Sequence, residues 1–92
     1  MKPFTIIAIY ADACTPDNNI QGCTMAETED GDLKITVNSS EGLFNLIQNV
    51  CQKISTEIQG YKDAGTTPKD DASSDIENSM DLLNSLSFHI WD

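Results

Sequence analysis

The sequence predicts an α+β domain: an antiparallel sheet of three to four strands, with one long and one shorter helix packed on one face. Short segments rich in Ile, Phe, Val and Thr, separated by turn residues, occupy the first 37 residues. Apolar residues at helical spacing then run over 43–61 and again over 76–86. A sheet this small needs the helices, because one of its apolar faces would otherwise lie in water.

The sheet is expected to combine an N-terminal strand with a hairpin. The segment of residues 3–11 is short and almost continuously apolar, which is typical of a central strand with both faces partly covered. Residues 20–28 and 33–37 follow as an antiparallel pair, and the second of these segments alternates apolar and polar residues. Asp30 and Gly31 predict a two-residue turn between them, because both turn positions require positive φ.

A long amphipathic helix follows the hairpin. Asn38 and Ser39 are the two candidate N-caps, and Glu41 completes a capping box with Asn38. The helix ends no later than Gly65, which suits a left-handed C-terminal residue. Its apolar positions recur at steps of three and four: Leu43, Phe44, Ile47, Val50, Cys51, Ile54, Ile58 and Tyr61. This spacing predicts one apolar face directed at the sheet.

A polar segment separates this helix from a second one. Residues 62–73 have no apolar periodicity and predict a mobile polar linker between the helices. The second helix is expected from Ile76 to about residue 86, after Ser74 and Glu77 at capping-box spacing. The tail over 87–92 alternates apolar and polar residues, which favours a last strand over a frayed helix end.

The charge balance excludes several classes of function. Residues 1–92 form a single acidic domain, with 15 Asp and Glu against 5 Lys and a formal net charge of −10. Such a chain does not neutralise a nucleic-acid backbone, so direct DNA binding is not expected. No apolar stretch approaches the about 20 residues of a membrane span, so neither a membrane partner nor a membrane location is expected.

The cysteines and the single histidine are the candidate catalytic or metal-binding residues. Cysteine occurs three times, and this odd number favours free thiols in a reducing cytoplasm. Cys51 has the spacing of a small core residue, whereas Cys14 and Cys23 flank a loop-like segment and can face each other. Either of these two with His89 would make a nucleophile–base pair or a small metal-binding module. Sequence spacing does not bring them together, so we expect no enzyme, no cofactor and no metal.

Two groups of carboxylates are the predicted partner-binding residues. They are Glu27, Glu29, Asp30 and Asp32 around the hairpin turn, and Asp70, Asp71, Asp75 and Glu77 before and at the start of the second helix. Adjacent like charges repel by about 1 kcal/mol per pair before screening. Docking on a basic protein surface would relieve that repulsion, although solubility alone is the simpler explanation of the acidity. Tyr61 and Trp91 are candidate apolar anchors, with core packing as their alternative role.

In length, acidity and sheet-plus-helix layout, the chain resembles small phage-encoded anti-CRISPR proteins. In size and charge it is most similar to inhibitors of the type I-F surveillance complex. The resemblance implies a stoichiometric inhibitor in the host cytoplasm that binds a CRISPR-Cas effector complex, near its guide RNA, and blocks target DNA by occupying basic nucleic-acid-contacting surfaces. An antitoxin-like or immunity-like protein that neutralises a basic partner is the alternative. Both hypotheses predict that binding depends on carboxylates.

Overall fold

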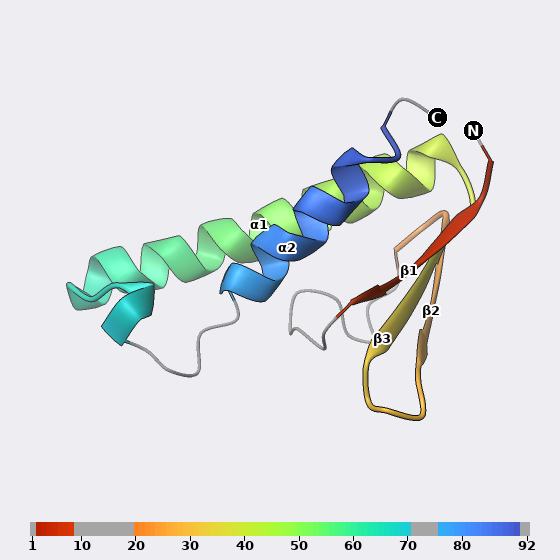
Figure 1. Ribbon diagram of the computed structural model, residues 1–92. Coiled ribbons are helices and arrows are strands. Elements are labelled where there is room, and N and C mark those ends of the chain that lie inside the picture. The colour runs from red at the N-terminus through yellow and green to blue at the C-terminus, as the bar shows by residue number, and fades with distance from the viewer. Residues whose placement is uncertain (1, 9–19, 71–75, 91–92) are drawn as a thin grey trace.

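The computed structural model describes residues 2–8, 20–70 and 76–90 of the chain. A three-stranded antiparallel sheet lies against two helices, one long and one shorter, which run antiparallel to each other (Figure 1). The elements in chain order are β1 (Phe4–Ala8), β2 (Cys23–Glu27), β3 (Leu33–Val37), α1 (Ser40–Ala64), a 3₁₀ turn (Pro68–Asp70) and α2 (Ile76–Ser87). This arrangement confirms the predicted α+β class.

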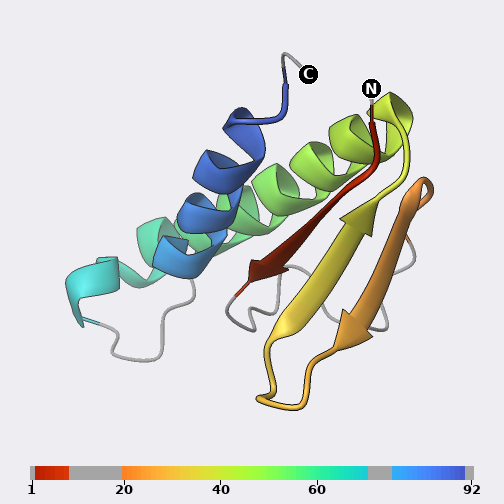
Figure 2. The same cartoon turned by 45° about the vertical axis from the view of Figure 1, so that its right-hand side comes forward.

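The central strand of the sheet is β3, with β1 and β2 at its two edges (Figure 2). Val37 pairs with Phe4 on one side and with Cys23 on the other. The prediction of a central strand over 3–11 is therefore wrong for the described residues. The short turn after β2 places that strand on one side of β3 and leaves the other side to β1. Ile7 lies on the sheet face away from the helices and is 58% exposed, so an apolar run here does not indicate two covered faces.

The hairpin turn differs from the predicted two-residue turn. Gly31 has φ +86°, but no described residue other than glycine has positive φ, so Asp30 does not adopt the conformation that such a turn requires. The Gly31 N–H donates to the Thr28 carbonyl at 3.0 Å, and the Thr28 N–H donates to the Asp32 carbonyl at 2.8 Å. The Thr28 hydroxyl also accepts from the Asp32 N–H at 3.0 Å. The loop is therefore a longer turn closed by a left-handed glycine, and several hydrogen bonds hold it.

The core lies between the sheet and the helices. Leu33, Ile35 and Val37 of β3 are buried, whereas Lys34 between them is exposed. The helices contribute the buried side chains of Leu43, Leu46, Val50, Leu82 and Leu86 to the same cluster. α1 packs against β2 and β3, while α2 packs against β1 and α1. One face of the sheet is thus covered by both helices, as the sequence predicted.

The first turn of α1 makes a close backbone contact with the start of β2. Ser39, one of the two predicted caps, is extended, and its hydroxyl accepts a hydrogen bond from the Gly42 N–H at 3.1 Å. Gly22 has φ +89° and lies against Gly42, where a Cβ on either glycine would overlap the backbone of the other. The Asn45 side-chain amide donates to the Gln21 carbonyl at 3.0 Å. These contacts fix α1 relative to the edge strand β2.

The end of α1 agrees with the expected C-terminal glycine. Gly65 has φ +69°, and the Thr66 N–H donates to the Tyr61 carbonyl at 3.0 Å, which satisfies a free carbonyl of the last turn. The first residues of the predicted linker over 62–73 therefore belong to α1, and Pro68–Asp70 forms a 3₁₀ turn. Residues 71–75 lie outside the described residues.

The segment after α2 does not form the predicted strand over 87–92. α2 extends to Ser87, and residues 88–90 form a turn in which the His89 N–H donates to the Leu86 carbonyl at 3.0 Å. Because this N–H is bonded at the helix end, it does not pair with the edge of the sheet. The prediction is wrong for the described part of the segment, and its last two residues lie outside the described ranges.

Candidate functional site

The hairpin turn carries the first predicted group of carboxylates. We call it the acidic tip, and it consists of Glu27, Glu29, Asp30 and Asp32. The tip projects from the end of the sheet, clear of both helices (Figures 1 and 2). Asp32 is half-buried and the other three residues are exposed. Among the described residues, none of the four carboxylates takes part in an ion pair. The turn and the last residue of β2 therefore gather four carboxylates at one end of the molecule, without an ion pair to any described residue.

The second predicted group is less coherent. The Asp70 carboxylate accepts hydrogen bonds from the backbone N–H and the hydroxyl of Thr67, at 3.2 and 3.1 Å, so it stabilises the 3₁₀ turn locally. Glu77 is exposed in the first turn of α2, where a negative charge also suits the helix dipole. Asp71 and Asp75 lie outside the described residues. Both described members of this group thus have a local structural explanation.

The two groups lie in different parts of the molecule. Both views place the 3₁₀ turn at the far end of α1, well away from the hairpin turn (Figures 1 and 2). The described members of the two groups, Asp71 and Asp75 thus excluded, do not form one surface, and among them the acidic tip alone gathers more than two. Of the two predicted anchors, Tyr61 is half-buried on α1 and Trp91 lies outside the described residues.

Cys23 and His89 do not meet. The Cys23 thiol donates to the Gly42 carbonyl at 3.2 Å, while the His89 ring stacks on Phe4 with 3.8 Å between ring centroids. Phe4 and Cys23 flank Val37 from opposite sides, so two strand spacings, about 10 Å, separate them. Cys14 lies outside the described residues. Across the described ranges, no group of three or more His, Cys, Asp and Glu is arranged to hold a metal ion.

The two described thiols should differ in reactivity. Burial raises the pKa of the Cys23 thiol above its ordinary value, whereas Cys51 is exposed on α1. Because the thiolate is the reactive form, we expect iodoacetamide to alkylate Cys51 about tenfold faster than Cys23 at pH 8 in a Cys14→Ser variant. Peptide mass spectrometry over a time course measures both rates. Equal rates would contradict the burial of Cys23.

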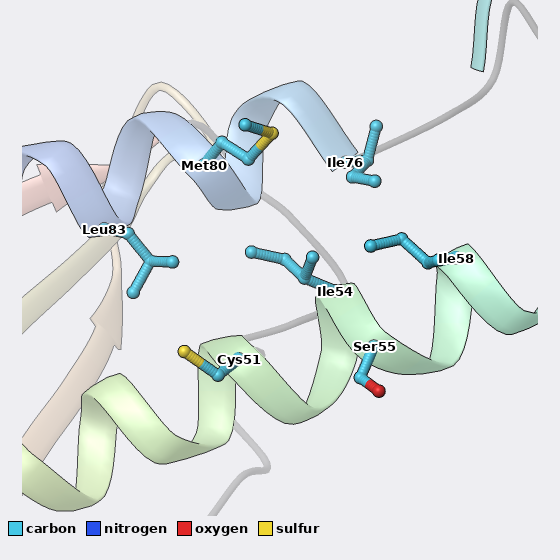
Figure 3. A pocket seen from close by; sticks show the side chains of 7 residues that line it. All are labelled: Cys51, Ile54, Ser55, Ile58, Ile76, Met80 and Leu83. Atoms are coloured by element: carbon cyan, nitrogen blue, oxygen red, sulfur yellow. The ribbon is translucent and has the colours of Figure 1, made fainter. Parts of the chain in front are cut away.

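A groove between α1 and α2 is the main feature that sequence reasoning missed. We call it the helical groove, and it has a volume of about 460 Å³ (Figure 3). Its lining residues are Cys51, Ile54, Ser55, Ile58, Ile76, Met80 and Leu83. The signal in the sequence is a seven-residue repeat, because Phe44, Cys51 and Ile58 lie seven residues apart on α1. The steps of three and four predict the sheet-facing side of the helix for these same positions.

Comparison with protein-family models, with curated protein sequences and with solved structures finds no match to the chain. Neither described helix combines the length and the apolar character needed to cross a membrane. The functional argument therefore depends on the two surfaces of the molecule itself. The acidic tip offers carboxylates for charge pairing, and the helical groove offers apolar side chains for packing.

Proposed function

We propose that the chain is a protein-binding inhibitor whose acidic tip occupies a basic, nucleic-acid-contacting surface of its target. The observation that carries the proposal is a group of four carboxylates, without an ion pair among the described residues, at one end of the hairpin. Glu29, Asp30 and Asp32 are on the hydrogen-bonded turn, and Glu27 is the last residue of β2. A turn that is already ordered loses little conformational entropy when it binds. The carboxylates therefore form a prearranged anionic surface, comparable to the phosphates that a basic groove normally holds.

Electrostatics supports this role in two ways. Docking on Lys and Arg side chains relieves the mutual repulsion of the tip carboxylates and replaces it with favourable pairs. The net charge of −10 also attracts a basic surface over a longer range, so association is fast at low salt and slower as salt is added. An inhibitor of this kind works by occlusion and needs no bond-making chemistry of its own.

The proposed target is a CRISPR-Cas effector complex in the host cytoplasm, which the resemblance to anti-CRISPR proteins suggests. In such a complex, basic surfaces hold the guide RNA and admit target DNA. The tip would bind near the guide RNA and prevent the DNA from entering or pairing. Inhibition would then be stoichiometric, and excess target DNA would compete with the chain for the same surface.

Charge reversal at the tip tests this proposal. We expect Glu29→Lys with Asp30→Lys to weaken inhibition of target-DNA binding by a purified type I-F complex about 100-fold at physiological salt, since repulsion replaces two charge pairs. Fluorescence anisotropy of labelled target DNA measures the inhibition. Glu41→Lys with Asp63→Lys is the matched control, because both residues are exposed and the net charge changes equally.

The control variant should retain inhibition within about threefold, and circular dichroism should show both variants folded. If the tip variant blocks DNA as well as the parent does, the tip is not the binding surface. If the parent chain itself fails to block DNA binding, the assignment to this target is wrong.

A further inference from the structure

The helical groove is an apolar surface that the described residues, 2–8, 20–70 and 76–90, leave uncovered. On α1 and α2, the side chains that face the sheet are buried, whereas those that line the groove are exposed or half-buried. Ile58 is 41% exposed, Met80 is 57% exposed, and Cys51 is also exposed. A concave, mostly apolar surface of this volume is typical of binding sites. The groove uses none of the residues of the acidic tip.

The groove has the length and shape of a site for a helix. The lining residues of α1 extend from Cys51 to Ile58, and those of α2 extend from Ile76 to Leu83. Seven residues of helix span about 10 Å, or two turns, so two parallel walls of this length flank the groove. A helix that places apolar side chains at positions i, i+3, i+4 and i+7 covers the same two turns. Figure 3 shows side chains from both helices in the space between them: Ile54 and Ile58 from α1, and Ile76 and Leu83 from α2.

The charges beside the groove indicate which helix would bind. Glu77 and Asp81 are exposed on α2, next to Met80, and Gln48 and Gln52 border the groove on α1. Lys62, one turn beyond Ile58, is a cation near one end. On α1, Lys53 and Glu57 form an ion pair at 3.6 Å that adds no net charge. The surroundings are therefore anionic along α2 and without net charge along most of α1. A second copy of the chain would bring the same acids and another net charge of −10, so repulsion opposes self-association.

We propose that the helical groove binds a basic amphipathic helix of a partner protein. The apolar face of that helix would fill the groove, and its Lys and Arg side chains would pair with Glu77 and Asp81. This inference goes beyond the proposed function, because it assigns a second binding surface with a different ligand chemistry. It also holds for any partner that carries such a helix, whether or not the acidic tip binds a nucleic-acid-contacting surface.

A synthetic peptide tests the groove directly. The probe is a fluorescent helix of about 14 Leu and Lys residues, with Leu at the four spaced positions, and its control is a scrambled peptide of the same composition and charge. We expect the amphipathic peptide to bind the full chain about tenfold more tightly than the scrambled one. It should also protect Cys51 from a maleimide in a Cys14→Ser chain. Equal binding of the two peptides, or no protection of Cys51, would overturn the proposal.

Variants of the chain separate the groove from general charge attraction. Ile58→Ala with Met80→Ala should weaken peptide binding about tenfold, whereas Ile7→Ala, equally exposed on the far face of the sheet, should leave it unchanged. Glu77→Gln with Asp81→Gln should weaken binding and reduce its dependence on salt. Equal effects of the groove and Ile7 variants would overturn the proposal.

Sedimentation velocity of the parent chain tests whether a second copy of the chain, and not a partner helix, occupies the groove. A monomer with a freely reactive Cys51 supports a vacant groove that awaits a partner. A dimer in which Cys51 is already protected without peptide would assign the groove to a second copy, and would overturn the proposal. None of these experiments alters a residue of the acidic tip. If the groove does not bind the peptide, the charge-reversal experiment therefore still tests the proposed function.

Discussion

Gly42→Ala is expected to destabilise the domain by about 1–3 kcal/mol, although alanine is the better helix former by about 1 kcal/mol. The reason is the contact between the first turn of α1 and the start of β2. A Cβ at Gly42 would overlap the carbonyl group of Gly22, and this group is backbone that cannot rotate away. The Gly22 carbonyl also accepts a hydrogen bond from the Asn38 N–H at 2.9 Å, which holds it in place.

Gly60→Ala in the same helix is the matched control. Gly60 is exposed, and a Cβ there would meet no atom within 4 Å. We therefore expect Gly60→Ala to stabilise the domain by up to about 1 kcal/mol, through helix propensity alone. Urea denaturation followed by far-ultraviolet circular dichroism gives the free energy of unfolding of each variant. Changes of the same sign in both variants would contradict the close glycine contact.

Leu46→Ala is expected to cost about 2–5 kcal/mol, which approaches the whole stability of a domain this small. Leu46 has no exposed surface and lies in the core cluster between α1 and the sheet. Phe44, two residues earlier on the same helix, is 57% exposed, so Phe44→Ala should cost about 0.5 kcal/mol or less. The larger side chain is thus expected to matter less, because burial and not size determines the loss.

The same urea measurements test this pair. The difference between the two variants should exceed about 1.5 kcal/mol, with similar slopes of free energy against urea. A larger loss for Phe44→Ala would show that α1 is rotated about its axis relative to the structure. The apolar spacing of the sequence alone placed Phe44, and not Leu46, on the sheet-facing side.

Local chemistry made most of the fold predictable. The hairpin, both helices and the helix-ending glycine Gly65 each depend on residues close to one another in the chain. The order of the strands was not predictable in this way, because it depends on which edge of β3 each neighbour occupies. The strong apolar character of β1 favoured a central position in the sheet, yet β1 is an edge strand and its Ile7 is exposed. The prediction of a strand after α2 was wrong for a related reason, because alternation of apolar and polar residues over such a short segment also occurs in a turn that ends a helix.

The candidate site was predictable only where its residues are neighbours in sequence. The acidic tip is contiguous, so the prediction and the structure place the same four residues together. The second acidic group spans a polar segment, and no sequence rule states where such a segment lies. The helical groove was missed because α1 carries apolar residues over more than one side. Spacing by three and four does not distinguish a buried side from a neighbouring exposed one.

The four buried residues of α1, Gly42, Leu43, Leu46 and Val50, all lie in the half nearer its N-terminus. Beyond Val50 the helix is held by α2 and by its own hydrogen bonds, with little support from strands. Local opening should therefore cost less free energy in the second half of α1 than in the first. The helical groove lies in this weaker half, so any molecule bound there would also act as a clamp that slows the fraying of both helices.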